Sequence, residues 1–355
     1  MKRNETLEDL HPQWLEYKAA ETSLANAHSL GNDWAKYYEG DPLTRRKMAS
    51  IKVPELLQWF LRKIAEHNLT RRKFRDMKTV LNSMLDYAVG MGFVEKNVSR
   101  YVPGISTKHF AIEVRKDKTE RVYLEDETGS LIDVCLERFE KTHNTAYLGI
   151  CMNLYLGLRV GELIALKVSD FSDSFVHIER EEIKHHEKKG NVITRNGYEV
   201  APYVKTPQSV RDVPLTSQAR RFLSMILAEN EKNGVHSEHV FLDKKTGERL
   251  HNDSINNILR KYVNPRLNTP QKANHSLRRT YLSTLDASGR LTDEEIREAA
   301  GHRHISTTRD NYLYSRKEDS HKVLAFEKAL CGNSVTPDNQ NVTSKSQNAK
   351  APETA

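Results

Sequence analysis

The chain has 355 residues, of which 37% are hydrophobic and 29% charged, and its formal net charge is +7. This composition excludes a disordered or fibrous protein and favours a soluble globular protein of about two domains. No apolar run reaches the ~18 residues of a membrane-spanning helix, and no hydrophobic segment behind Met1 indicates a signal peptide. The positive charge is concentrated in residues 1–120 and favours a polyanionic partner.

Residues 1–105 are predicted to form a helical domain. Thr6 and Asp9 have the spacing of a capping pair at the start of a first helix. Apolar residues recur at helical spacing in four segments. These segments are residues 6–17, 23–39, 53–64 and 70–88. Gly90 and Gly92 are expected to end the last helix.

Two basic clusters in this domain are candidates for contact with phosphate. One consists of Arg45, Arg46 and Lys47, and the other of Arg71, Arg72, Lys73 and Arg75. Each cluster alone is equally well explained as the solvated surface of a helix. Together with the motifs further along the chain, phosphate contact becomes the better interpretation.

The polar, highly charged residues 106–123 are predicted to be an exposed linker between two domains. Residues 124–330 are predicted to form a second domain, mainly helical with a few strands. Its helices are expected near 126–141, 144–156, 161–166, 216–233, 253–263, 275–288, 292–300, 305–313 and 317–330. Residues 331–355 are rich in Asn, Ser, Thr and Pro and are predicted to be a flexible tail.

Strand signals occur in the middle of the second domain. Residues 175–178 form one candidate strand, and residues 198–204 and 210–215 are predicted to pair as a hairpin. The polar residues 181–197 are expected to be a loop or a β insertion. The fold class is therefore mainly α with a small antiparallel β-sheet, an α+β arrangement.

The three cysteines, Cys135, Cys151 and Cys331, are odd in number and far apart. This pattern predicts reduced thiols in a cytosolic protein, with Cys135 and Cys151 packed between helices. A metal site is not expected at His185, His186, His302 or His304, because their spacing is not that of helical ligand pairs and no cysteine pair accompanies them.

Two arginines have the chemistry to hold a phosphodiester. Arg159 and Arg278 carry guanidinium groups, which bind phosphate oxygens through two parallel hydrogen bonds and stay charged. Glu162 is expected to orient Arg159, although a lone pair of this kind is often only a surface salt bridge. His275 lies three residues before Arg278, so both side chains can face one ligand at the start of a helix.

A nucleophile, a base and an acid complete the candidate set. Tyr312 would attack the phosphorus, but a phenol ordinarily titrates near pH ~10 and needs a base and a positive environment. His275 can take its proton, and His302 can hydrogen-bond a phosphate oxygen. Lys205, beside a predicted turn, can protonate the leaving oxygen. Tyr314 is the rival nucleophile, and Tyr281 is a weaker candidate.

The ordered set resembles the catalytic signature of the tyrosine recombinases, the phage integrase family. The matching segments are the run from Gly157 to Leu163 as the first arginine box, His275 with Arg278 as the second, Gly301-His302 as the third, and Tyr312 as the nucleophile. The run from Lys205 to Leu215 is similar to the β-hairpin lysine segment of integrases from phages and conjugative transposons of low-GC Gram-positive bacteria. Tyr312 follows His302 by ten residues, as in that subgroup.

The resemblance implies a clamp in which a helical core-binding domain and a catalytic domain grip opposite faces of double-stranded DNA at a specific core site. Tyr312 would form a 3′-phosphotyrosine and release a 5′-hydroxyl, with no cofactor and no metal. A homotetramer would exchange strands during integration or excision of a mobile element, in the cytoplasm at the nucleoid. An accessory directionality factor is a possible further partner, and Arg211 and Arg279 are added to the candidate DNA contacts.

Some alternatives stay open at this point. A type IB topoisomerase would use the same chemistry, and a non-catalytic DNA-binding regulator would keep the fold without the reaction. The helix predicted after Tyr312 is expected to dock on a neighbouring protomer, or else on its own domain. Integrases of that subgroup often carry a small arm-binding domain before the helical domain, which here begins near Met1, so whether this protein binds arm sites stays open.

Overall fold

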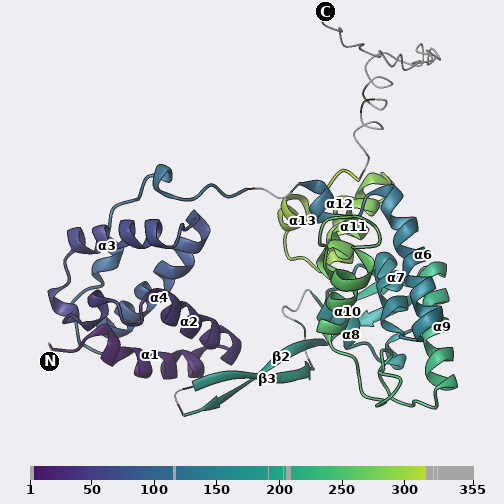
Figure 1. Cartoon of the computed structure of the whole chain (residues 1–355), viewed down its shortest axis with the longest axis horizontal. Coiled ribbons are helices and arrows are strands. Elements are labelled where there is room, and N and C mark those ends of the chain that lie inside the picture. The colour runs from purple at the N-terminus through teal and green to yellow at the C-terminus, as the bar shows by residue number, and fades with distance from the viewer. Residues whose placement is uncertain are drawn as a thin grey trace, which may run out of the picture.

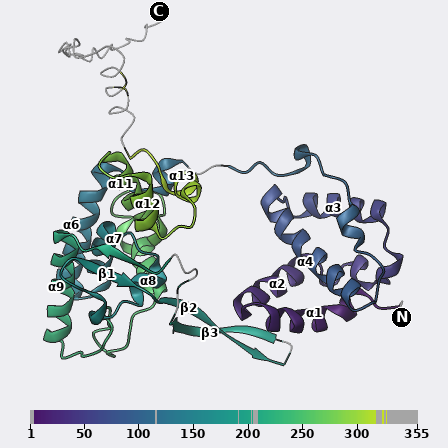
Figure 2. The same cartoon turned by 180° about the vertical axis from the view of Figure 1, so that it is seen from behind.

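The computed structural model describes residues 4–114, 117–190, 192–202, 204, 209–316, 323 and 326. It is mainly helical with two small antiparallel sheets, which confirms the predicted fold class. A helical N-terminal module and a larger C-terminal domain lie side by side (Figure 1). The linker joins them on one side, and the hairpin formed by β2 (Glu181–Lys189) and β3 (Val192–Ala201) reaches across on the opposite side (Figure 2). No helix in the described ranges is both long and apolar enough to cross a bilayer.

Four helices and three short 3₁₀ turns build the N-terminal module. They are α1 (Leu7–Glu21), α2 (Leu24–Tyr37), α3 (Val53–Glu66), α4 (Arg71–Gly90), η1 (Pro42–Arg45), η2 (Met48–Ser50) and η3 (Val98–Tyr101). The predicted cap is confirmed, because Thr6 Oγ1 accepts the Asp9 N–H at 3.1 Å and the Asp9 carboxylate accepts the Thr6 N–H at 3.2 Å. The apolar faces of all four helices meet around Trp14, Phe60 and Leu81, which are buried.

The linker packs against the N-terminal module where it begins. It contains a 3₁₀ turn, η4 (Thr107–His109), and a short helix, α5 (Lys118–Arg121). The Ala111 N–H donates to the Leu69 carbonyl at 2.9 Å, and the Phe110 ring lies 5.4 Å from that of Phe74. The first part of the linker therefore belongs structurally to the N-terminal module.

The C-terminal domain is built around α7 (Ala146–Leu156), which is buried on almost every side. The other helices and turns of this domain surround it. They are α6 (Glu125–Thr142), α8 (Val160–Ile164), η5 (Val168–Asp170), α9 (Ser217–Lys232), α10 (Asn252–Ile258) with the π-helical turn η7 (Leu259–Val263), α11 (Asn274–Ala287), α12 (Asp293–Ala300) and α13 (Ile305–Tyr312). Cys135 on α6 and Cys151 on α7 are buried free thiols, as predicted.

The strands pair differently from the prediction. β1 (Phe175–Ile178) pairs with β4 (Arg211–Pro214), and β2 (Glu181–Lys189) pairs with β3 (Val192–Ala201). The predicted hairpin between 198–204 and 210–215 is therefore wrong, and the β insertion is confirmed as the alternative. Val176 faces Val213 across the β1–β4 pair and both are fully buried, so this pairing places its apolar residues in the core.

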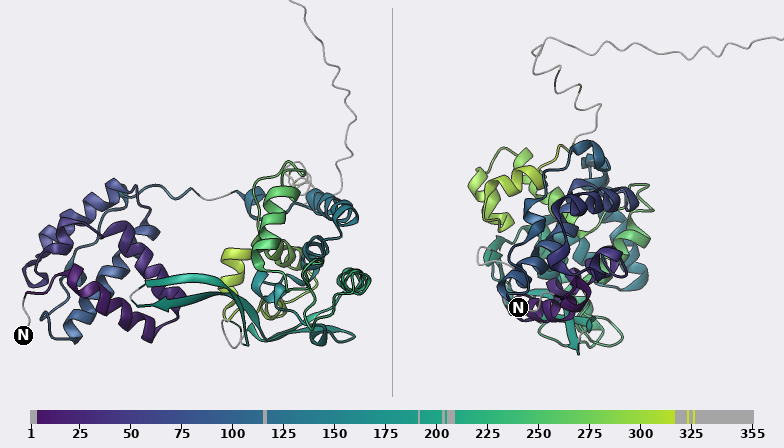
Figure 3. Two further views of the ribbon diagram at one scale, coloured as in Figure 1. Left: turned by 60° about the horizontal axis from the view of Figure 1, so that its bottom comes forward. Right: turned by 90° about the vertical axis from the view of Figure 1, so that its left-hand side faces the viewer.

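The β2–β3 hairpin projects from the C-terminal domain and touches the N-terminal module (Figure 3). His28 Nδ1 lies 2.7 Å from the Ile193 carbonyl oxygen, and Lys188 Nζ lies 3.1 Å from Glu16 Oε1. The rings of His28 and His186 are 5.2 Å apart. Of the helix predicted over 317–330, only Val323 and Phe326 are described, both in helical conformation. The predicted tail, 331–355, lies outside the described residues.

Candidate active site

Arg159 lies in the turn between α7 and α8. Gly157 ends α7 with φ +61°, and a Cβ there would lie 2.1 Å from the Tyr281 ring, so only glycine fits. The Glu162 carboxylate on α8 accepts the Arg159 backbone N–H at 3.0 Å and its Nη1 at 2.6 Å. The Arg159 side chain keeps 27% of its surface exposed, which leaves it accessible to a ligand.

Glu162 lies between two guanidinium groups. Its carboxylate is fully buried and is bound on the other side by Arg211, whose Nη2 lies 2.9 Å from Oε2. Burial alone would raise the pKa of Glu162, but the charges of Arg211, Arg278 and Arg159 lower it to about 2. Glu162 is therefore an anion at neutral pH, and it orients Arg159 as the sequence indicated.

Arg278 on α11 is fully buried. Its Nη1 donates to the Gly157 carbonyl at 2.7 Å, and its Nη2 donates to the Ala300 carbonyl and lies 3.3 Å from His302 Nε2. Burial lowers the pKa of Arg278 to about 10, so the group stays charged at neutral pH. Its Nε–H finds no acceptor among the described residues, so Arg278 carries one buried donor without a partner.

His302 is held in one tautomer by its partners. An arginine nitrogen can only donate, so Nε2 must accept from Arg278, and Nδ1 then carries the proton and donates to Thr308 Oγ1 at 2.9 Å. Burial and the charges of Arg278, Arg159 and Arg211 lower the pKa of His302 to about 3. A neutral His302 therefore orients the Arg278 guanidinium.

Tyr312, the last residue of α13, packs against these groups. Its ring centroid lies 4.6 Å from that of His302, 5.0 Å from that of His275, and 5.6 Å from the Arg278 guanidinium carbon. Ser283 Oγ donates to the Tyr312 carbonyl at 2.9 Å, which ties the end of α13 to α11. Burial and the charges of Arg279, Arg278 and Arg159 lower the pKa of His275 to about 4, so its imidazole is neutral at neutral pH.

The two rival tyrosines lie elsewhere. The Tyr314 hydroxyl is 2.9 Å from Arg121 Nη1, and its ring stacks under the same guanidinium at 5.6 Å. Tyr281 is buried against Gly157. Tyr312 is thus the tyrosine whose ring contacts Arg278, His275 and His302 together.

The remaining candidates are spread more widely. Lys205 lies outside the described residues. Arg279 borders the site, with its guanidinium carbon 6.0 Å from the Tyr312 ring centroid. Arg211 was expected to contact DNA. Its side chain is instead 6% exposed and donates hydrogen bonds to protein groups, so it lies inside the domain and not on a DNA-facing surface. The reason is the buried Glu162, which requires a second counter-charge.

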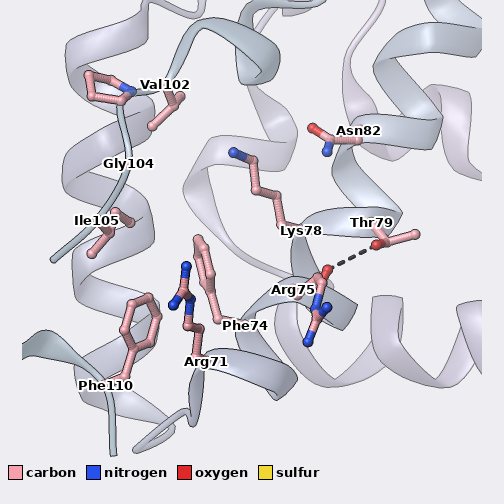
Figure 4. Close-up of a pocket in the computed structure, with 11 residues that line it drawn as sticks. Arg71, Phe74, Arg75, Lys78, Thr79, Asn82, Val102, Gly104, Ile105 and Phe110 are labelled. Atoms are coloured by element: carbon pink, nitrogen blue, oxygen red, sulfur yellow. Dashed lines mark hydrogen bonds between the residues drawn. The ribbon is translucent and has the colours of Figure 1, made fainter. Parts of the chain in front are cut away.

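The two basic clusters lie on different elements of the N-terminal module. Arg45 pairs with Glu8 at 3.2 Å and Arg46 with Glu55 at 3.2 Å, both at the surface. Lys47, Arg72 and Lys73 are exposed. Arg71 and Arg75 line a groove between α4 and the start of the linker, whose other wall includes Ile105 and Phe110 (Figure 4).

Lys78 also lines this groove and was missed from the sequence. Its ammonium points toward the linker side of the groove in Figure 4, and burial lowers its pKa. Arg71, Arg75 and Lys78 are spaced four and three residues apart, so helical periodicity places them on one face of α4. The spacing of these three residues could have identified Lys78 from the sequence as a further candidate for phosphate contact.

Comparison with known proteins decides the family. Residues 121–319 match the phage integrase family. The chain belongs to the phage integrase family. It is thus a tyrosine-type site-specific recombinase, an enzyme of mobile-element integration.

Individual relatives of this recombinase agree with the assignment. A probable integrase of prophage ps2 from Lactococcus lactis subsp. lactis is 27% identical over 322 residues, which cover 81% of this chain and 79% of the relative. The Tn1549 transposon integrase, solved with a circular intermediate DNA, superimposes with a TM-score of 0.63 at 18% identity, covering 92% of this chain and 99% of that one. A lambda integrase dimer bound to a core site gives a TM-score of 0.60 at 14% identity, covering 90% and 80%. These structures share the recombinase's fold.

Proposed function

We propose that this recombinase cleaves one strand of a specific DNA core site with Tyr312 as the nucleophile. The observation that carries the proposal is the convergence on one tyrosine of groups that lie far apart in the chain. The Tyr312 ring contacts His275, His302 and Arg278, and Arg278 is joined through Gly157 to the turn that carries Arg159.

Arg159 and Arg278 are proposed to hold the scissile phosphate. Arg159 presents an accessible guanidinium group that Glu162 orients. Arg278 presents its Nε–H, which has no acceptor within the described part of the chain. Two positive charges beside the phosphate stabilise the extra negative charge that develops as the phosphorus becomes five-coordinate. Because Arg278 is already bonded to two carbonyls and His302, it needs little reorganisation when the phosphate enters.

The step balances with the chain's own groups. The Tyr312 oxygen forms a bond to phosphorus while the bond from phosphorus to the 5′ oxygen breaks. The phenol proton passes to His275, whose lowered pKa keeps it neutral beforehand. Lys205 gives a proton to the departing 5′ oxygen. The 3′-phosphotyrosyl bond retains the energy of the broken phosphodiester, so a 5′-hydroxyl from a second strand can reverse the step.

The N-terminal module is proposed to bind the DNA backbone beside the core site. Its groove presents Arg71, Arg75 and Lys78, and the exposed clusters around Arg45 and Arg72 are further candidates. A lambda integrase tetramer has been solved on a Holliday junction, and we propose that four copies of this chain likewise bring two sites together. Such an enzyme would work at the nucleoid, for integration and excision of the element, with an accessory protein setting the direction.

A nicked suicide substrate tests the proposal, because the released strand diffuses away and traps the covalent intermediate. The substrate spans the junctions of the element that encodes the chain. Wild-type protein and Tyr314→Phe are expected to form a covalent adduct, whereas Tyr312→Phe binds the DNA with unchanged affinity and forms none. An undiminished adduct with Tyr312→Phe would contradict the assignment and move the nucleophile elsewhere.

A further inference from the structure

Arg211 is buried beside the active site, and the cleavage step described above gives it no role. It is the first residue of β4, where it pairs with Ile178 of β1. Only 6% of its side chain is exposed. A buried guanidinium is costly unless its donors are satisfied, so its partners show what it does.

Four hydrogen bonds connect Arg211 to three separate segments. Nη2 and Nη1 donate to the two oxygens of Glu162 at 2.9 and 3.3 Å. Nη1 also donates to the Ser209 carbonyl at 2.9 Å, and Nε donates to the Ala299 carbonyl at 3.1 Å. The planar fork therefore holds these segments at defined angles to one another, which a lysine ammonium cannot do.

Each of the three segments leads directly to a group of the proposed reaction. Glu162 binds both the backbone and the side chain of Arg159. Ala299 is followed by Ala300, whose carbonyl accepts from Arg278, and then by Gly301 and His302. Ser209 leads back to Arg159, because its Oγ lies 3.5 Å from Arg159 Nη1.

Close packing around Gly301 supports the same role for Arg211. A Cβ on Gly301 would lie 3.1 Å from Cδ and Nη1 of Arg211, so the turn before His302 rests directly on the guanidinium. Gly301 also has φ +58°, which favours glycine at this position for a second reason. The position of the His302 turn thus depends on the side chain of Arg211.

Charge explains why a cation is needed here. Glu162 is fully buried, and Arg211 is the partner that most strongly lowers its pKa. Without Arg211, the Glu162 carboxylate would lose the guanidinium that fixes both of its oxygens and keeps it ionised. Glu162 would then hold Arg159 in a less defined orientation toward a phosphate.

We propose that Arg211 is a positioning residue for DNA cleavage, which sets the Arg159 guanidinium through Glu162 and anchors the turn before His302. The proposal rests on the function proposed above. Arg211 itself contacts protein groups and does not need to touch the DNA.

The test compares four variants of the full chain in single-turnover adduct formation on the suicide substrate. They are Arg211→Met, Arg211→Lys, Glu162→Gln and the double variant Arg211→Met/Glu162→Gln. Arg266→Met is the matched control, because Arg266 is an exposed arginine that pairs with Glu137 away from the site. DNA affinity and thermal unfolding are measured for each, so that loss of folding is separated from loss of rate.

Arg211→Met is expected to bind DNA like the wild type and to form adduct about 10- to 100-fold more slowly. This is the loss of activity typically seen when a residue that orients a metal-binding side chain is removed from an enzyme. Arg211→Lys should lie between the two, and Arg266→Met should match the wild type. The double variant should be no slower than the slower single variant, because both changes act through the same carboxylate.

A second readout is the pH dependence. Removing Arg211 raises the pKa of Glu162, so protonation disables the Arg159 contact at a higher pH than in the wild type. The ratio of wild-type to Arg211→Met rates should therefore grow as the pH falls from 7 to 5. A constant ratio, or multiplying effects in the double variant, would overturn the positioning role. If the wild type forms no adduct at all, it is the proposed function that fails.

Discussion

The imidazoles of His275 and His302 illustrate how neighbouring charge sets a side chain's role. Both lie near Arg278 and Arg159, and burial combined with these cations lowers their pKa values to about 4 and about 3. A histidine that is neutral throughout the physiological range can accept a proton from a phenol or a hydrogen bond from an arginine. A protonated one could do neither.

Proton NMR titration of the free protein tests these two histidines. Their ring signals should remain those of neutral imidazole at pH 5.5, where an ordinary histidine is mostly protonated. His275→Gln and His302→Gln assign the signals. A midpoint near 6.5 for either ring would contradict the proposed proton acceptor or the proposed partner of Arg278.

The same shifts predict the direction of acid destabilisation. Because the folded pKa values lie below the unfolded value of about 6.5, unfolding takes up protons, and the free energy of unfolding falls as the pH drops from 6.5 toward 4. Each such histidine contributes a slope of at most about 1.4 kcal/mol per pH unit. Chemical denaturation of the wild type and of His275→Gln across this pH range measures the slope.

The α7–α8 turn is the element on which the active site depends most directly. Gly157 ends α7, accepts from Arg278 through its carbonyl, and lies against the Tyr281 ring. The short helix α8 then places Glu162 so that it binds back to Arg159. The geometry of one turn thus positions both proposed phosphate-binding arginines.

Gly157→Ala is expected to destabilise the protein by about 2–4 kcal/mol, because the new methyl group both meets Tyr281 and requires a left-handed conformation. Gly289→Ala is the matched control, since its φ of +62° is nearly the same but its Cβ would meet nothing within 4 Å. Chemical denaturation measures both variants. Equal destabilisation of the two would mean that the clash with Tyr281 costs nothing.

Among the residues that the structure describes, two connections link the N-terminal module to the C-terminal domain. The linker is covalent, and the β2–β3 hairpin adds contacts from Lys188 to Glu16 and from Ile193 to His28 on the opposite side. Figures 1 and 2 show the linker and the β2–β3 hairpin running between the two modules on opposite sides. The groove lined by Arg71, Arg75 and Lys78 belongs to the smaller module.

Salt dependence of DNA affinity tests that groove. Changing Arg71, Arg75 and Lys78 together to Gln should weaken binding and reduce the slope of log affinity against log salt by about 0.9 for each phosphate that is no longer neutralised. The matched variant changes Arg45, Arg46 and Lys47 to Gln, and its slope should change less because Arg45 and Arg46 already pair with glutamates. An unchanged slope in the groove variant would exclude these cations from phosphate binding.

Local sequence patterns were sufficient to predict most of the helices and the types of residue that form the candidate active site. The repeat of apolar residues and the Thr6–Asp9 cap depend on neighbours three or four positions apart, so they can be read directly from the chain. The spacing of Arg159, His275, Arg278, His302 and Tyr312 matched a family signature. His275, His302 and Arg278 do meet around Tyr312, and Arg278 binds the carbonyl of Gly157 in the turn that carries Arg159. Lys205, which the signature also includes, lies outside the described residues.

Tertiary structure alone decided the strand pairing, the burial of Arg278 and the place of Arg211. A strand pairs with the partner that places its apolar residues in the core. Val213 therefore pairs with Val176, which lies far from it in the sequence. Whether an arginine faces DNA or a buried carboxylate depends on what the fold brings beside it, here Glu162 from a helix far away in the chain. The sequence therefore shows which chemistry a charged side chain can perform, but only the folded structure shows its partner. The reason is that the cost of burying a charge is offset by contacts with residues far away in the chain.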